Sequence, residues 1–146
     1  MTNTTAHSPA ASLGLLLLRV ITGGIIAAHG AQKIFEFTLP GTVGSFAGMG
    51  VPFPEIAAPV VAFVELIGGI LLALGFLTRI VGILLAVDMI VALILVHLAA
   101  GLWVGDGGYE FVAVLGAAAL ALALIGAGRF SLDRALLRGR GIAWLR

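Results

Sequence analysis

Long runs of apolar residues, separated by short polar or glycine-rich segments, dominate the pattern of this chain. The runs cover residues 12–35, 55–77, 79–100 and 109–126. Each is close to the roughly 20 residues that a helix needs to cross about 30 Å of hydrocarbon. Because backbone amides in lipid must find their partners within the protein, each run is predicted to be a membrane-spanning helix. The pattern therefore predicts an all-α fold, an integral membrane bundle of four transmembrane helices.

Composition supports this class and narrows the chemistry. The 146 residues are 61% hydrophobic and 10% charged, and the mean hydropathy is +1.20, which leaves too little polar surface for a soluble globule. A chain of this length is predicted to form a single membrane domain over residues 1–146. The net charge of +1 gives no reason to expect a nucleic-acid partner. Since the chain has no cysteine, thiol redox chemistry is excluded, and a redox role would require a bound cofactor or a partner.

Positive charge gives the orientation. The segment after the fourth run carries five arginines, whereas the loop at 101–108 has no basic residue. The positive-inside rule therefore places the C-terminus in the cytoplasm, and four spans return the N-terminus to the same side. The basic tail at 129–146 is predicted to form a short helix on the anionic inner leaflet. The loop between the first two spans is rich in glycine and proline and is predicted to be re-entrant or to lie along the interface.

Three of the ionisable residues in the apolar runs are predicted to form a group deep in the membrane. They are Arg19, Glu65 and Asp88. Each costs a few kcal/mol in hydrocarbon unless it is paired or faces water. Counting residues from the ends of each span places both carboxylates near the midplane, within reach of the long arginine side chain. We therefore predict a buried ion pair between Arg19 and Glu65, with Asp88 as a second partner or a proton-carrying site. The simplest interpretation is a salt bridge that locks the bundle.

A second polar group is predicted nearer the outer surface. On the first helix, spacings of three or four residues place His29 and Lys33 on one face, and other polar side chains fall at a similar depth. The residues predicted to line an outward-facing pocket are His29, Gln32, Lys33, His97 and Glu110. A quinone is one candidate ligand, because imidazole exchanges hydrogen bonds and protons with a quinone carbonyl. A divalent metal is a weaker candidate, since no close pair such as H-x-x-x-H is present, and interfacial residues without chemistry are the third interpretation.

Several segments together resemble the DoxX family of small bacterial membrane proteins. The matching positions are Arg19, "HGAQKIF" at 29–35, "GMGVPFP" at 48–54, "VELIGGILLALGFLTR" at 64–79, His97, "GGYEF" at 107–111 and "GAGRFSLD" at 126–133. The resemblance extends over about residues 13–133. It implies a four-helix protein of the bacterial inner membrane.

What the resemblance implies about function is divided. Relatives are linked to a thiosulfate:quinone oxidoreductase and to a membrane oxidoreductase complex active in oxidative stress, while the wider superfamily is similar to cargo receptors and assembly chaperones. One hypothesis is a quinone-linked subunit without independent activity, which works with another membrane or membrane-associated oxidoreductase subunit or as a homo-oligomer. The other is a non-catalytic scaffold or assembly protein. No catalytic residue is assigned by either hypothesis, and no metal is predicted.

Overall fold

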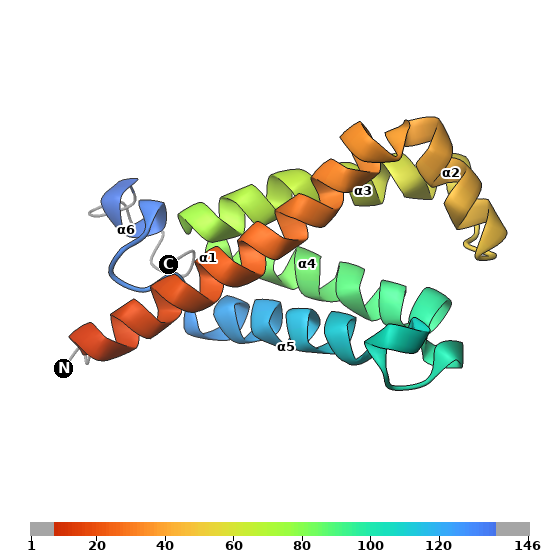
Figure 1. Ribbon diagram of the computed structural model, residues 1–146. Helices are drawn as coiled ribbons and strands as arrows, with labels where there is room; N and C mark the ends of the chain where they lie inside the picture. The colour runs from red at the N-terminus through yellow and green to blue at the C-terminus, as the bar shows by residue number, and fades with distance from the viewer. Residues whose placement is uncertain (1–7, 137–146) are drawn as a thin grey trace.

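The computed structural model describes residues 8–136, which are helical apart from short connections and contain no strand. The elements follow the chain in this order: α1 (Pro9–Ala31), the π-helical turn η1 (Gln32–Glu36), α2 (Thr38–Gly48), α3 (Pro54–Leu74), α4 (Thr78–Ala92), the π-helical turn η2 (Leu93–His97), the 3₁₀ turns η3 (Leu98–Ala100) and η4 (Val104–Asp106), α5 (Glu110–Ile125) and α6 (Leu132–Leu136) (Figure 1). The predicted all-α bundle is confirmed. Three continuous helices are long and apolar enough to cross a membrane, namely Pro9–Glu36, Pro54–Leu74 and Thr78–Ala100, and α5 is a shorter apolar helix.

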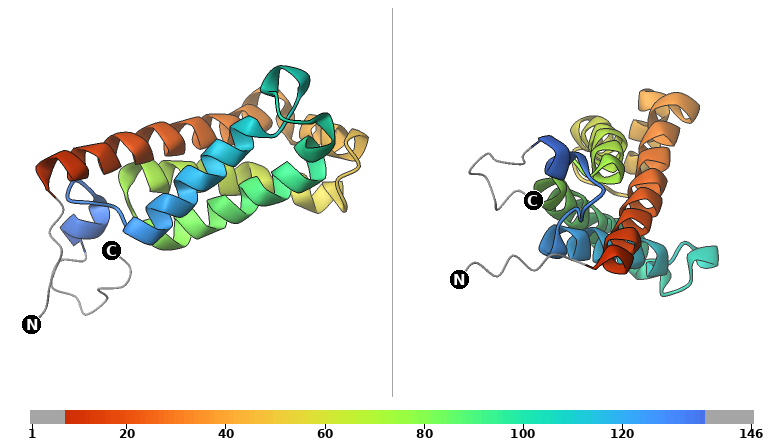
Figure 2. Two further views of the ribbon diagram at one scale, coloured as in Figure 1. Left: turned by 90° about the horizontal axis from the view of Figure 1, so that it is seen from below. Right: turned by 90° about the vertical axis from the view of Figure 1, so that its left-hand side faces the viewer.

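The four long helices associate as two closely packed pairs. The main contacts join α1 to α3 and α4 to α5, while α3 with α4 and α1 with α5 connect the pairs. Figure 2 shows these helices arranged around a common centre. The beginning of α1 and the short helix α6 lie at one end of the bundle, and α2 lies at the other (Figure 1). Most of the predicted tail helix, residues 137–146, falls outside the described residues.

Glycines set the distance between α1 and α3. A Cβ atom on Gly23 would overlap the carbonyl oxygen of Gly69, and one on Gly30 would overlap the backbone of Leu66. A side chain at either position would force the helices apart, so the backbones are in direct van der Waals contact, as small residues allow in membranes. This packing fixes the register of the pair. It places the third turn from the start of α3 beside the last turn of α1.

The glycine- and proline-rich segment between the first two spans was predicted to be a loop, but its residues 38–48 form the helix α2. Pro40 lies in the first turn of this helix, where its missing N–H is not needed for an intrahelical hydrogen bond. The Thr42 hydroxyl donates to the carbonyl oxygens of Lys33 at 2.8 Å and of Thr38 at 3.0 Å. Since Thr42 is buried, these bonds attach α2 firmly to the end of α1 and place it across the end of the bundle.

A buried carboxylate organises the opposite end. The Asp133 side chain accepts hydrogen bonds from the backbone N–H groups of Leu77 at 2.7 Å and Thr78 at 3.0 Å. Leu77 is the N-cap of α4, and Thr78 is its first residue. The Asp133 backbone N–H donates to the carbonyl of Gly75 at 2.8 Å. A carboxylate at a helix N-terminus satisfies otherwise unpaired donors and interacts favourably with the helix dipole. Asp133 therefore joins α6 to the turn between α3 and α4.

Substitution of this carboxylate provides a stability test. Asp133→Ala is expected to lower the free energy of unfolding by about 2–4 kcal/mol, because it leaves two donors at the start of α4 unpaired. Asp133→Asn, which keeps one acceptor oxygen, should lose less. Unfolding in mild detergent measures both variants, with the exposed neighbour Arg134→Ala as the matched control. Equal stability of Asp133→Ala and Arg134→Ala would contradict the capping role.

Candidate functional site

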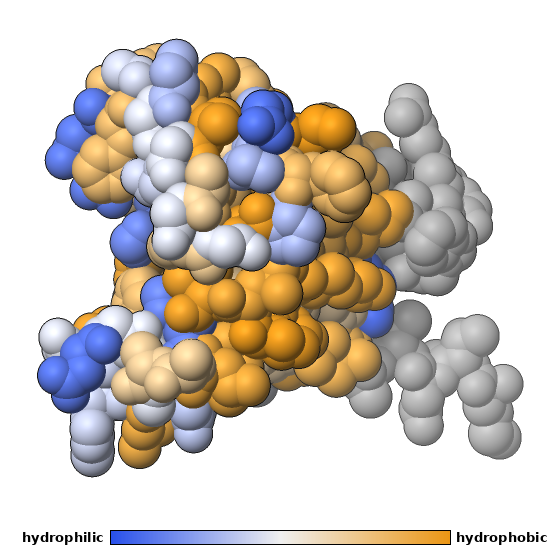
Figure 3. All heavy atoms as spheres, turned by 90° about the vertical axis from the view of Figure 1, so that its right-hand side faces the viewer, coloured by the Kyte–Doolittle hydropathy of each residue, from blue (hydrophilic) through white to orange (hydrophobic). Residues whose placement is uncertain are grey.

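A cavity of about 370 Å³ lies at the α2 end, between the long helices. Its walls are mainly apolar, with Ile26 and Met89 toward the centre of the bundle and Phe46 of α2 and Val104 of the 101–109 loop toward the end. Four polar side chains also line it, from three different helices: His29, Lys33, Glu65 and His97. Figure 3 views this end of the molecule and shows apolar surface in the middle with hydrophilic residues at the margins. An apolar cavity with a few convergent polar groups is the usual form of a small-molecule site.

The central polar contact of the cavity joins α1 and α3. Lys33 Nζ lies 2.5 Å from Glu65 Oε2, in both a hydrogen bond and an ion pair. The Lys33 and Glu65 side chains are 19% and 7% exposed, so water screens the pair only weakly. A charge-assisted hydrogen bond in such surroundings is stronger than one at a surface.

The predicted pairing of Arg19 with Glu65 is therefore wrong. Arg19 lies beside Gly75 at the far end of α3, ten residues and about 15 Å along the helix from Glu65. There its guanidinium donates to the carbonyl oxygens of Ala127, at 3.3 Å, and of Phe130. The ion pair with Glu65 is made instead by Lys33, which the close packing of Gly30 on α3 brings to the same level.

Asp88 lies close to this ion pair without joining it. The side chain is near enough to Glu65 and Lys33 to interact electrostatically with both. Its Oδ2 atom is buried and has no hydrogen-bond partner among the described residues. The predicted network of Arg19, Glu65 and Asp88 is thus replaced by a Lys33–Glu65 pair with a neighbouring carboxyl group on α4.

Two of the predicted pocket residues hold the loop that closes the cavity. His97 Nδ1 donates to the carbonyl oxygen of Gly107 at 2.7 Å, and Glu110 Oε1 accepts from the backbone N–H of Val104 at 2.7 Å. His97 also lines the cavity, whereas Glu110 is not among the lining residues. The loop at 101–109 is therefore held by one side chain from each of the helices that flank it.

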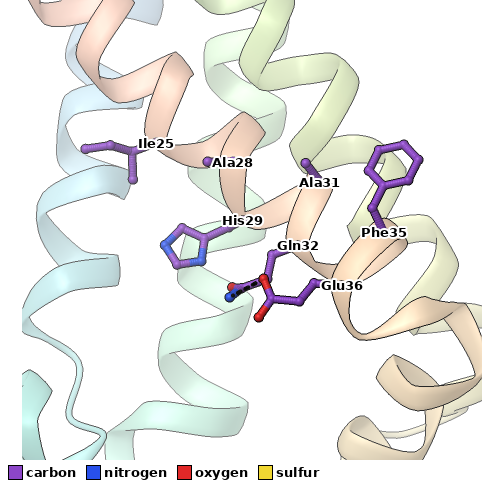
Figure 4. A pocket seen from close by; sticks show the side chains of 7 residues that line it. All are labelled: Ile25, Ala28, His29, Ala31, Gln32, Phe35 and Glu36. Carbon is purple, nitrogen blue, oxygen red and sulfur yellow. Dashed lines mark hydrogen bonds between the residues drawn. The ribbon is translucent and has the colours of Figure 1, made fainter.

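Of the remaining predicted residues, His29 lies at the side of the cavity and Gln32 lies outside it. The His29 ring packs edge-on against Phe111, with ring centroids 5.7 Å apart. Gln32 lies outside the cavity, in a groove along α1, where its Nε2 donates to Glu36 Oε2 at 3.3 Å. Figure 4 shows the side chains of His29, Gln32 and Glu36 on one side of the helix, with Phe35 also among the residues that line the groove. Over residues 8–136, no group of three His, Cys, Asp or Glu side chains is placed to hold a metal ion.

Comparison with known proteins identifies the family. The DoxX family model matches residues 14–98. The chain belongs to the DoxX family. It is 39% identical over 128 residues to the "Putative oxidoreductase CatD" of Bacillus subtilis (strain 168), and this alignment covers 88% of the chain and 90% of that protein. It is 33% identical over 126 residues to the "Inner membrane protein YphA" of Escherichia coli (strain K12), and this alignment covers 82% of the chain and 88% of that protein. No solved structure shows significant similarity to the chain.

The comparisons confirm the family predicted from the motifs, and they support the predicted location. This DoxX chain is a multi-pass protein of the bacterial inner membrane. Its exposed apolar side chains on the long helices, such as Ile21, Ile67 and Val87, are in contact with lipid.

The π-helical turns of this DoxX chain were not predicted. η1 contains Lys33 and η2 contains His97, so two cavity side chains from different helices each lie in a π turn. In η1 the hydrogen bond runs over five residues, from the Phe37 N–H to the Gln32 carbonyl at 2.9 Å. Such a turn shifts every following side chain around the helix axis, and π turns occur frequently at functional sites. Hydrophobic periodicity gives no signal that separates one π turn from continued α-helix.

Proposed function

We propose that this DoxX-family chain is the quinone-binding membrane subunit of an oxidoreductase complex. The observation that carries the proposal is the apolar cavity into which a lysine and two imidazoles project from two helices. Ring-shaped redox cofactors are bound in such sites, where apolar side chains cover the ring and a few polar groups orient its oxygens. The name of the 39% identical relative, an oxidoreductase, supports the same class of function.

The polar groups of the cavity suit the two oxygens of such a ring. Lys33 Nζ has three hydrogens and gives one to Glu65, which leaves donors for a carbonyl oxygen. The Gly107 carbonyl can only accept, so His97 Nδ1 must carry the hydrogen of that bond. In the neutral ring Nε2 is then an acceptor, suited to a hydroxyl of the reduced ring. A bound quinone would supply two-electron, two-proton chemistry, while these side chains would orient it and hold its protons.

A partner protein is part of this proposal. The chain has no cysteine, and the described residues outside the long helices form only α2, α6 and short loops, with no separate domain to hold a soluble substrate. We therefore assign oxidation of the substrate to a second subunit. If the arginine-rich C-terminus is cytoplasmic, the cavity end faces the outer side of the membrane, because α6 and α2 lie at opposite ends of the bundle (Figure 1).

Quinone occupancy after gentle purification tests the site. The wild-type protein from its native membrane should contain quinone detectable by mass spectrometry of the extracted lipids. His29→Ala and His97→Ala are each expected to lower this occupancy about five- to tenfold, which corresponds to the loss of one hydrogen bond or ring contact. Leu98→Ala is the matched control, since Leu98 is exposed and adjoins His97 outside the cavity.

Wild-type occupancy in both histidine variants would refute the site. A stable complex with another membrane protein that contains no quinone, and that survives both substitutions, would instead support the scaffold hypothesis.

A further inference from the structure

The groove beside the cavity is a second feature of the same end of the molecule. It runs along the last turns of α1 and is lined by Ile25, Ala28, His29, Gln32 and Glu36, among others. His29 lines both the groove and the cavity. The two spaces therefore lie on either side of this side chain, whose ring contacts Phe111 of α5.

Polarity changes along the groove. Ile25 and Ala28, farther from the end of the bundle, are apolar and adjoin the lipid-exposed surface of α1. Gln32 and Glu36, nearer the end, form the hydrogen-bonded polar pair. This order matches the outer half of a bilayer, where hydrocarbon gives way to the polar interface.

The cavity is too small for a long-chain ligand. A volume of about 370 Å³ is near the lower limit of small-molecule pockets and accommodates a ring but not a polyprenyl chain. The chain of a membrane quinone must therefore leave the cavity toward lipid. The end of the cavity is covered by α2 and by the loop that His97 and Glu110 hold with hydrogen bonds. In contrast, no hydrogen bond to a described residue fixes the His29 ring at the side.

We propose that the groove is the chain-binding subsite of the cavity. The ring of a polyprenyl quinone would lie in the cavity. Its chain would leave past the His29 ring, which would turn away from Phe111, and would follow Ile25 and Ala28 into the lipid. Glu36 at the polar end of the groove selects for a neutral ligand, because an anionic lipid head group would be repelled there. This inference rests on the proposed function and adds the route of the ligand and the requirement for a chain.

A pair of probes separates the ring site from the chain site. Ala28→Trp fills the groove, and Ala28 is an exposed residue that does not line the cavity. In proteoliposomes of neutral lipid, we expect this variant to bind a long-chain menaquinone at least tenfold more weakly than wild type, and menadione, which has the ring but no chain, within twofold of wild type. Ala117→Trp on the exposed surface of α5 is the matched control and should bind both probes as wild type does.

Each outcome bears on a definite part of the inference. Unchanged binding of both probes by Ala28→Trp, or equal weakening of both, would overturn the chain subsite. Binding of neither probe by the wild-type protein would overturn the proposed function itself. If Ala28→Trp does not fold, Ala28→Leu replaces it, with the same selective loss for the long-chain probe expected at about threefold.

Discussion

Replacement of Lys33 by methionine is expected to lower the free energy of unfolding by about 3–5 kcal/mol. Methionine keeps most of the side-chain volume but removes the cation, which leaves the Glu65 carboxylate, 7% exposed, without its partner in an apolar wall. Removing one partner of a buried ion pair lowers stability by more than the intact pair adds to it, because the remaining charge stays buried without a counter-charge. Reversible unfolding in a mild detergent gives the change directly.

The double variant Lys33→Met with Glu65→Met separates charge from packing. It should recover most of the stability lost by Lys33→Met, since a buried pair can often be replaced by apolar side chains without loss. Arg129→Met, at an exposed cation, controls for the removal of positive charge and should change stability by less than about 0.5 kcal/mol. If the double variant is as unstable as Lys33→Met, the ion pair does not explain the role of Lys33.

The helices were predictable from the sequence because hydrocarbon imposes a simple rule on apolar segments. Runs such as 55–77 had to become helices, and the structure places α3 at Pro54–Leu74. The rule does not extend to residues outside hydrocarbon. Gly41 and Pro40 predicted a loop, but α2 forms because the proline lies in its first turn and Thr42 bonds back to Lys33. Tertiary contacts of this kind have no signature in local composition.

The polar residues of the site were predictable, but their partners were not. Lys33 and Glu65 were assigned to different depths because each was counted from the predicted end of its own span. The actual level of each side chain depends on the register between α1 and α3, which Gly30 sets by packing on the backbone of Leu66. Two π turns then change the direction of the last residues of α1 and α4. Neither effect can be counted from hydropathy.

The glycine that sets this register gives the second large effect. Gly30→Ala is expected to lower the free energy of unfolding by about 3 kcal/mol or more, because the added Cβ would overlap the Leu66 backbone, which cannot move aside as a side chain can. Gly24→Ala is the matched control on the same helix. It has open space at its Cβ position and should be neutral or stabilising by up to about 1 kcal/mol, since alanine favours helix.

Gly30→Ala should also disturb the candidate site, although Gly30 does not line the cavity. Separation of α1 from α3 at this level pulls Lys33 away from Glu65, whose atoms are now 2.5 Å apart, and widens the cavity wall. Quinone occupancy measured at a temperature where the variant remains folded should therefore fall with Gly30→Ala and stay unchanged with Gly24→Ala. A folded Gly30→Ala variant with full occupancy would show that the site does not depend on the close approach of the two helices.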